Sequence, residues 1–276
     1  MKIKKEDVLY YITVGVFLLF TLGPIFWCFI ISISPEKEML NSSTHLFPKS
    51  ITLENYKKLL TDDNFYLALK NSLITAGVTI FLGLPVSIMS GYSFSRLKFK
   101  GRKLLEVLIL TTIVIPLFTT IIPLYTIFAN LGMLDNIFWV SIIYVSSFLP
   151  MVTWIMTNYF KGIPKEIEEM ALIDGCGRIK ILFYIILPNT YPIILASVLI
   201  IFLMSWSQYQ IPLILASSRS TKPLSILIAE FSSKDMINYG LMASGGILAV
   251  LPPSIFAIIF RKYLVTGLTK GAVTGE

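Results

Sequence analysis

The sequence predicts an all-α integral membrane protein, because it is apolar, contains long stretches without charge, and distributes its basic residues unevenly. Hydrophobic residues make up 55% of the 276 residues and charged residues 14%, whereas a soluble domain carries about 25% charged residues. A helix that crosses a hydrocarbon layer of ~30 Å needs about 20 apolar residues, and six charge-free stretches are at least that long. We therefore predict a single transmembrane domain, residues 1–276, whose six spans cover about 8–33, 71–95, 106–130, 137–160, 190–216 and 237–261.

The basic residues predict the orientation of these spans. If the amino terminus is cytoplasmic, fifteen of the 23 Lys and Arg residues lie in cytoplasmic segments, while the 16 acidic residues divide equally between the two sides. An excess of Lys and Arg, counted without the acidic residues, marks the cytoplasmic side of a membrane protein. Both termini are therefore predicted to be cytoplasmic, and the net charge of +7 reflects a lipid bilayer and not a nucleic-acid partner.

The first apolar stretch follows Lys2, Lys4 and Lys5, an arrangement shared with secretory signal peptides. The apolar core of a signal peptide has about 7–15 residues. This stretch is longer, and no small-residue cleavage site closes it. We interpret it as a retained span, with a cleaved leader as the alternative.

The residue types within the spans exclude several functions. The only histidine, His45, lies in an outer loop, so no His-based metal site or Ser–His pair is expected inside the membrane. No carboxylate lies in the middle of a span, where an ion-coupled carrier usually keeps one, and there is no phosphate-binding G-x-x-x-x-G-K-S/T loop. We predict no catalytic residue, metal site or cofactor on this chain. A carrier or channel that acts alone, and a membrane-embedded enzyme, are the alternative classes; a buried ionisable group, an inverted repeat or a catalytic constellation would favour them, and we find none.

Proline occurs within most of the spans, and two explanations stay open. Prolines can bend helices around a transport path, or they can reflect the ordinary frequency of proline in membrane helices. In the outer loop 35–70, residues 41–43 predict a turn. The spacing of apolar residues over 53–60 predicts a short amphipathic helix on the membrane face.

The cytoplasmic segment 161–188 predicts a helix-turn-helix. Pro164 suits a first helical position, and Gly175 suits the left-handed residue that ends a helix. Three acidic residues suit the positive end of the helix dipole: Glu166, Glu168 and Glu169. The first helix should cover about 164–174 and carry on one face Ile163, Ile167, Met170 and Ala171. The second helix should start near Arg178 and stop around Leu187 and Pro188. An amphipathic loop on lipid headgroups is the alternative, which three clustered glutamates disfavour beside an anionic leaflet.

Within this segment, Glu169-Met-Ala171-Leu-Ile-Asp174-Gly175, followed by Ile185, Leu187 and Pro188, resembles the EAA loop of permeases of binding-protein-dependent ABC importers. The family pattern reads E-A-A-x-x-D-G-A and closes with I-x-L-P about a dozen residues later. Met170 and Cys176 stand where alanine is usual, and Leu182 stands where phenylalanine is usual. Residues 51–60, 71–72, 91–96, 99–102 and 267–275 are similar to the smaller six-span subunit of carbohydrate permeases of the maltose-transporter type.

The resemblance implies the type I ABC importer fold and a permease subunit in the bacterial cell membrane, forming half of a pore for a sugar, with an oligosaccharide favoured. It implies three kinds of protein partner: a second homologous permease subunit, two cytoplasmic ATPase subunits that bind ATP and Mg, and an extracytoplasmic solute-binding protein. In this family the EAA helix docks in a cleft of the ATPase. Coupling to the ATPase is accordingly expected of Glu166, Glu169, Met170, Ala171, Asp174, Gly175, Leu187 and Pro188.

Three of these residues have a physical role in that interpretation. Ala171 is small enough to let the helix seat closely, Gly175 makes the turn, and Asp174 can hydrogen-bond nearby backbone amides. For Asp174, stabilisation of the turn without contact to the partner is the alternative.

The fifth span carries a polar patch near its middle, at residues 205–210. Sugars are bound by side-chain hydrogen bonds combined with aromatic surfaces. The patch is therefore a candidate lining of the substrate path through Ser205, Trp206, Gln208, Tyr209 and Gln210. Hydrogen bonding between helices of two subunits is the alternative.

Overall fold

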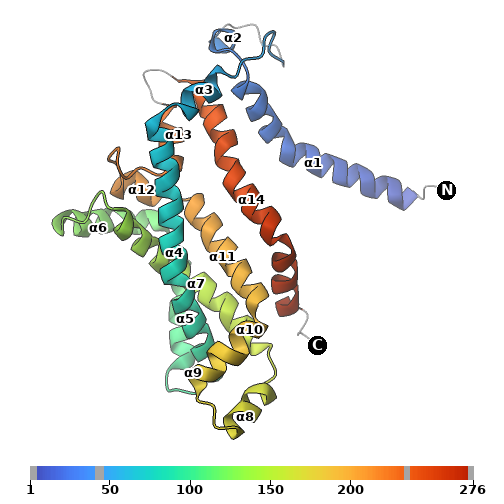
Figure 1. Ribbon diagram of the computed structural model, residues 1–276, viewed down its shortest axis with the longest axis vertical. Coiled ribbons are helices and arrows are strands. Elements are labelled where there is room, and N and C mark those ends of the chain that lie inside the picture. Colours follow the sequence, from blue (N-terminus) through green and yellow to red (C-terminus); the bar gives the residue numbers. More distant parts are fainter. Residues whose placement is uncertain (1–4, 41–46, 233–236, 273–276) are drawn as a thin grey trace. The chain divides into compact units, whose positions relative to one another are not determined.

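The computed structural model describes residues 5–40, 47–232 and 237–272, and every regular element within them is helical. Figure 1 labels the helices along the chain, which divides into two compact units. One consists of Met1–Leu67 and Leu224–Pro252, the other of Ala68–Pro223 and Pro253–Glu276. The expectations that involve Lys2, Lys4, the turn at 41–43, His45 and residues 273–275 lie outside the described residues.

In the first unit, polar side chains hydrogen-bond to the carboxyl end of its longest helix, α1. The unit contains α1 (Lys5–Ser32), α2 (Glu36–Leu40), α3 (Glu54–Leu60), α13 (Leu224–Glu230) and the first part of α14 (Tyr239–Ala272). The buried Asn55 of α3 donates hydrogen bonds to the carbonyls of Ser32, at 3.1 Å, and Ser34, at 3.3 Å. Ser244 of α14 also donates to the Ser32 carbonyl, at 3.2 Å. These bonds satisfy carbonyls that a helix end leaves unpaired, and α3 confirms the short helix predicted in the outer loop.

The remainder of α1 exposes apolar side chains along nearly its whole length. A helix that is apolar all round and uncovered suits contact with lipid or with another membrane protein. This agrees with the prediction of a first membrane span.

Four of the predicted spans correspond to helices that are long and apolar enough to cross a membrane: Val8–Ser32, Asp63–Arg96, Ile137–Lys161 and Tyr239–Tyr263. A fifth span results if Arg178–Asn189 and Tyr191–Trp206, which meet at an angle of 82°, are counted together. By length and composition the described residues therefore supply four such helices, or five spans if the bent pair is one span, and the third predicted span is divided between two shorter helices.

The third predicted span, 106–130, is not one helix. It is split between α5 (Arg102–Thr112) and α6 (Leu117–Asn130). Pro116 lies between them in an extended conformation, with φ −63° and ψ 130°. Proline lacks an N–H group and collides with the carbonyl four residues earlier, and α5 ends at that residue, Thr112. Pro116 therefore interrupts the helix within the predicted span, whereas Pro123 remains inside α6.

The fifth predicted span, 190–216, is also interrupted. After α11 (Tyr191–Trp206) the chain leaves the helix over residues 207–209 and resumes as α12 (Gln210–Leu215). Pro212 lies two residues into α12, and its ring would collide with the carbonyl of Gln208 in a continuous helix. The interruption therefore falls on the polar patch.

The second unit is built around α7 (Ile137–Lys161), which packs against α5, α11 and α12. Its contact with α4 (Asp63–Arg96) depends on small residues spaced four apart, Gly83, Ser87 and Gly91. A Cβ atom on Gly91 would lie 2.6 Å from the Cβ of Met156. Small residues at this spacing let two membrane helices approach closely, so α4 and α7 form one seam.

The turn before α7 is tied to the segment that follows α12. Asp135 has a φ of 52°, and its carboxylate accepts hydrogen bonds from the backbone N–H of Ser218, at 2.8 Å, and from the Thr221 hydroxyl, at 3.2 Å. Burial by itself would raise the pKa of Asp135, but these hydrogen bonds outweigh it, and the pKa lies below its usual value. The turn is thus held by a charged acceptor.

Candidate functional site

The first helix of segment 161–188 is α8 (Glu166–Ile173), and a glycine ends it as predicted. Gly175 has a φ of +79°. Its N–H group donates to the Leu172 carbonyl at 3.1 Å, and the Cys176 N–H donates to the Ala171 carbonyl at 2.9 Å. This pair of bonds defines a Schellman motif, which satisfies terminal carbonyls and requires a left-handed residue. Pro164 precedes α8 by two residues and does not occupy its first position.

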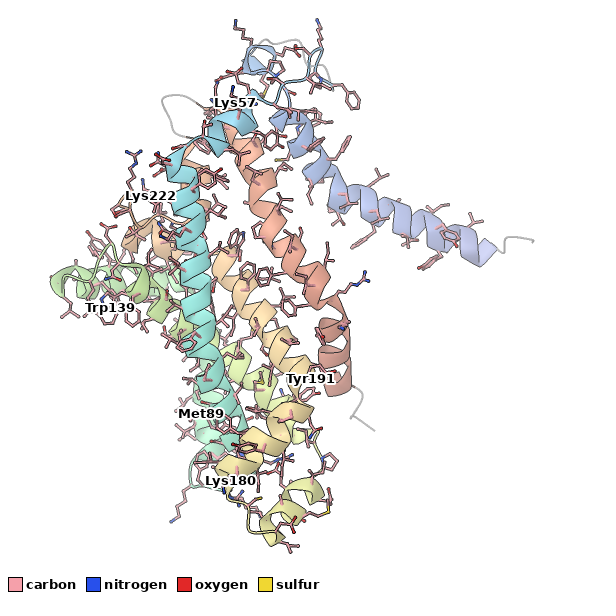
Figure 2. The ribbon with its side chains drawn as sticks, in the orientation of Figure 1. Lys57, Met89, Trp139, Lys180, Tyr191 and Lys222 are labelled. Atoms are coloured by element: carbon pink, nitrogen blue, oxygen red, sulfur yellow. The ribbon has the colours of Figure 1, made fainter. Side chains whose placement is uncertain are left out.

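The second helix starts at Arg178, also as predicted, and continues through three short elements: α9 (Arg178–Ile181), the π-helical η1 (Leu182–Ile186) and α10 (Leu187–Asn189). Pro188 cannot donate a backbone hydrogen bond, and a wider π turn is one way to accommodate such a residue. The chain then bends by 82° into α11. Leu187 is half-buried and Pro188 is exposed, and the exposed Lys180 lies on α9 (Figure 2).

Two residues of α8 are buried, Glu168 and Ala171. The Glu168 carboxylate pairs with Arg96, the last residue of α4: Nε of Arg96 donates to Oε1. The Tyr92 hydroxyl donates to Oε2 at 3.0 Å. Nη2 of Arg96 also donates to the Ile163 carbonyl at 2.7 Å. Both carboxylate oxygens of Glu168 and two of the three guanidinium nitrogens of Arg96 therefore have hydrogen-bond partners within this chain.

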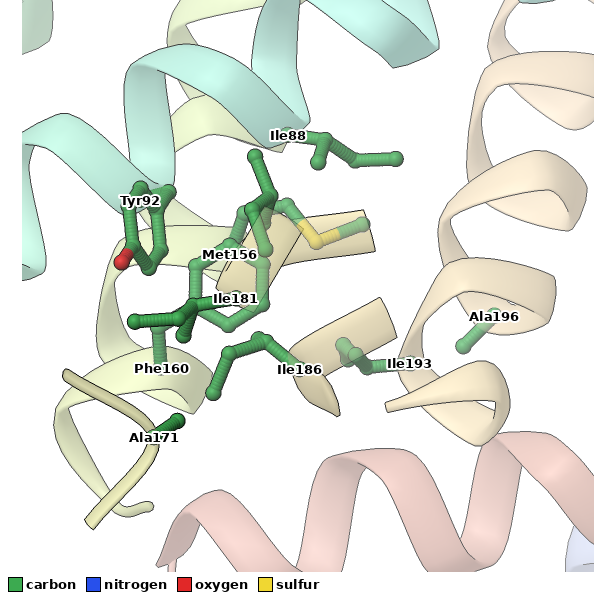
Figure 3. Packing of buried hydrophobic residues seen from close by; sticks show 10 residues of the cluster. Ile88, Tyr92, Met156, Phe160, Ala171, Ile181, Ile186, Ile193 and Ala196 are labelled. Atoms are coloured by element: carbon green, nitrogen blue, oxygen red, sulfur yellow. The ribbon is translucent and has the colours of Figure 1, made fainter. Parts of the chain in front are cut away.

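Ala171 belongs to an apolar cluster that joins α8 to α4, α7, α9, η1 and α11 (Figure 3). The buried members of the cluster are Ile88, Tyr92, Met156, Phe160, Ala171, Ile181, Leu182, Ile186, Ile193 and Ala196. Tyr92 and Phe160 meet edge to face, with ring centroids 6.3 Å apart. The small side chain of Ala171 thus faces its own chain, where a larger one would have to displace the cluster.

The opposite side of α8 is open. Ile173 is 85% exposed and Met170 is 60% exposed. Glu166, Glu169, Asp174 and Gly175 are exposed as well. The expected apolar face of Ile163, Ile167, Met170 and Ala171 is therefore divided: Ala171 points inward, whereas Ile167 and Met170 point outward. The spacing of apolar residues did not predict the buried face of α8, because that face consists of one small apolar residue, Ala171, and one carboxylate, Glu168.

Sequence reasoning missed Arg96, Tyr92 and the inward position of Glu168. A signal was present, because Glu168 and Ala171 are three residues apart and so share one face of a helix. The partner of Glu168 could not be found in this way. Arg96 lies 72 residues away, and only the packing of α4 against α7 brings it near.

The polar patch of the fifth span lies where the helix is interrupted. Ser205 and Trp206 end α11, Gln208 and Tyr209 lie in the non-helical residues, and Gln210 starts α12. The Ser205 hydroxyl is buried and has no hydrogen-bond partner within the described residues. Non-helical backbone at membrane depth is tolerated only inside protein or beside a water-filled cavity. The interruption therefore marks a place where polar groups require a partner.

The chain combines membrane-length helices with a short helix-turn-helix, the arrangement that the resemblance to permeases of ABC importers predicts. A family model described as binding-protein-dependent transport system inner membrane component matches residues 83–270. The chain belongs to this family, and it is an integral inner-membrane permease.

Several relatives found by sequence are permeases of sugar transport systems. The chain is 31% identical to the trehalose/maltose transport system permease protein MalG of Thermococcus litoralis, over 92% of each protein. It is 32% identical to the maltodextrin transport system permease protein MdxG of Bacillus subtilis, over 83% of each. It is 31% identical to the arabinooligosaccharides transport system permease protein AraQ of the same organism, over 92% of this chain and 91% of that protein.

A solved structure has the same fold. It is a chain of a bacterial ABC transporter involved in the import of the acidic polysaccharide alginate, with a TM-score of 0.79 and 21% identity, over 95% of this chain and 99% of that chain. The predicted fold class, an all-α permease of the type I importer kind, is confirmed.

Proposed function

We propose that this permease imports a sugar, with an oligosaccharide favoured, as half of a pore that a second homologous permease subunit completes. The names of the relatives support the substrate class, since they transport trehalose or maltose, maltodextrins and arabinooligosaccharides. Two cytoplasmic ATPase subunits bind the ATP and Mg that drive transport, and an extracytoplasmic solute-binding protein delivers the sugar. Both termini of this chain are cytoplasmic, and the chain itself holds no cofactor.

The outward side of α8 carries the proposal. Its exposed apolar residues, Met170 and Ile173, lie beside the acidic Glu166 and Glu169. Acidic side chains disfavour contact with anionic headgroups, and exposed apolar side chains rimmed by polar ones mark protein interaction sites. We assign this side to the ATPase: Met170 enters its cleft, and Glu169 and Asp174 flank the contact. Ala171 and Gly175 act from within the chain, by seating α8 and by ending it, and Leu187 and Pro188 set the bend into α11.

The interrupted fifth span supplies the substrate path in this proposal. Substrate sites in transporters are commonly formed by discontinuous helices. The break at 207–209 brings amide, hydroxyl and aromatic groups to one place: Ser205, Trp206, Gln208, Tyr209 and Gln210.

The coupling assignment is tested by placing a charge on the open side of α8. We expect Met170→Asp and Ile173→Asp to be inserted normally but to lose the ATPase subunits on purification. ATP-driven uptake in proteoliposomes should fall by about tenfold or more, as when a central interface side chain is removed. The control is Phe99→Asp, which charges an exposed apolar residue of the preceding cytoplasmic loop. Retention of the ATPase by both α8 variants would contradict the proposal.

A further inference from the structure

Arg96 and Glu168 occupy complementary helix ends. Arg96 is the last residue of α4, and Glu168 lies in the first turn of α8. A cation at a carboxyl terminus and an anion at an amino terminus are each favoured by the helix dipole. The same guanidinium reaches the carbonyl of Ile163, which precedes α8. One side chain of α4 therefore holds both the first turn of α8 and the chain leading into it.

We infer that Arg96 and Glu168, assisted by Tyr92, are positioning residues that join α8 to α4, so that a displacement of α8 is passed directly to this span. The inference rests on the proposed function, because it assigns these residues a mechanical part in ATP-driven coupling. It goes further in naming the span that α8 moves and the atoms that connect the two helices.

The burial of the pair supports a role other than stability. The side chains of Arg96 and Glu168 are 4% and 8% exposed. Removing two charges from water largely offsets their attraction, and apolar residues of similar size often hold such a place as well or better. By contrast, the ion pair between Lys161 and Glu106 is 41% and 23% exposed. That pair also joins two cytoplasmic helix ends, but it remains in solvent and costs little to form.

The geometry favours a rigid connection. Arg96 and Tyr92 are one turn apart on α4, and they bind different oxygens of the same carboxylate. Two donors from one helix fix the orientation of the Glu168 side chain as well as its position. The apolar attachment of α8 is small by comparison, because Ala171 is its one buried apolar residue. Movement of one packed element with another requires such a connection between them.

The experiment uses the complete transporter in proteoliposomes with its solute-binding protein, and maltotriose as the probe. The measured quantity is the amount of sugar moved per ATP hydrolysed. Glu168→Gln and Arg96→Gln should retain the ATPase subunits and hydrolyse ATP, but move about 2- to 30-fold less sugar per ATP, the range seen for residues that carry coupling. The matched controls, Glu106→Gln and Lys161→Gln, remove an ion pair at the same end of the helices and should leave the ratio unchanged.

An unchanged ratio in the two glutamine variants would overturn the inference. If those variants fail to assemble, Tyr92→Phe replaces them, since it deletes one hydroxyl and leaves the ion pair. It is expected to lower the ratio about twofold, at the small end of coupling effects, and an unchanged ratio there would assign the pair to folding alone. A wild-type complex without ATP-driven uptake of the probe would count against the proposed function and not against the connection between α8 and α4.

Discussion

The α8 region and the interrupted fifth span differ in whether a buried polar group of each has a hydrogen-bond partner. Next to α8, both carboxylate oxygens of Glu168 are bonded within the chain. In the fifth span, the buried hydroxyl of Ser205 has no hydrogen-bond partner within the described residues, and the helix opens over 207–209. A buried polar group without a partner costs about 1–3 kcal/mol. The Glu168 carboxylate is thus satisfied within this chain, whereas the Ser205 hydroxyl is not.

Under the proposed function, this difference suits the different tasks of the two regions. A part that transmits force has to keep its shape, and a closed set of internal bonds does so. In the proposed substrate path a polar solute exchanges hydrogen-bond partners repeatedly, and a buried hydroxyl without a partner, such as that of Ser205, permits this exchange. Four substitutions, in three experiments, test this contrast, from the largest expected effect to the smallest.

Gly175→Pro changes the turn that ends α8. Proline fixes φ near −65° and removes an N–H group, whereas Gly175 has a φ of +79° and donates to Leu172. We expect ATP-driven uptake below about a tenth of wild type with normal membrane insertion, because proline cannot adopt this φ and destabilises such a position by more than ~1 kcal/mol. Uptake in proteoliposomes checks this.

The control for this substitution is Gly177→Ala. Gly177 has a φ of −72°, and a Cβ atom there meets nothing within 4 Å. Near-normal uptake is expected. If Gly175→Pro also transports normally, the shape of the turn is not needed, and the contrast between the two regions fails.

Gly91→Val disturbs the close contact between α4 and α7, which brings Arg96 near α8. Its Cβ atom would lie 2.6 Å from the Cβ of Met156 and 3.0 Å from the backbone nitrogen of Thr157. Such overpacking typically costs about 1–3 kcal/mol, so we expect a lower melting temperature of the purified protein. Gly77→Val on the same helix meets nothing within 4 Å and should melt close to wild type. Equal melting of the two variants would show that α4 and α7 do not need this close contact.

Gln208→Leu and Gln210→Leu remove two amides from the polar patch of the fifth span. If these amides bind the sugar, each lost hydrogen bond should raise the half-saturating sugar concentration about 2- to 10-fold, from a net bond of about 0.5–1.5 kcal/mol. The maximal uptake rate should change less. The control is Thr126→Val on α6, where the hydroxyl bonds to its own helix at the Ile122 carbonyl. An unchanged concentration dependence would assign the patch to packing between helices.

Much of this architecture could be predicted from the sequence. Charge-free stretches of sufficient length locate the first, second, fourth and sixth spans, because the energy of inserting a helix into lipid is a local property of its residues. The end of α8 at Gly175 and the start of the second helix at Arg178 could be predicted for the same reason, since turn chemistry depends on neighbouring residues. The motif from Glu169 to Gly175 gave the family.

The interruptions and the ion pair could not be predicted. Pro116 and Pro212 accompany breaks, whereas Pro85, Pro123 and Pro150 remain inside helices. Which proline breaks a span depends on whether neighbouring helices accommodate the bend, and a linear pattern does not contain this information.

The sequence by itself determined that the chain is an integral membrane protein, where the first helix of segment 161–188 ends and where the second starts, because hydrophobic length and turn chemistry depend on adjacent residues. Only the tertiary structure decided which side of α8 faces outward and what holds it. A charge can be buried only where a distant partner meets it, and that partner, Arg96, reaches Glu168 through the packing of separate helices.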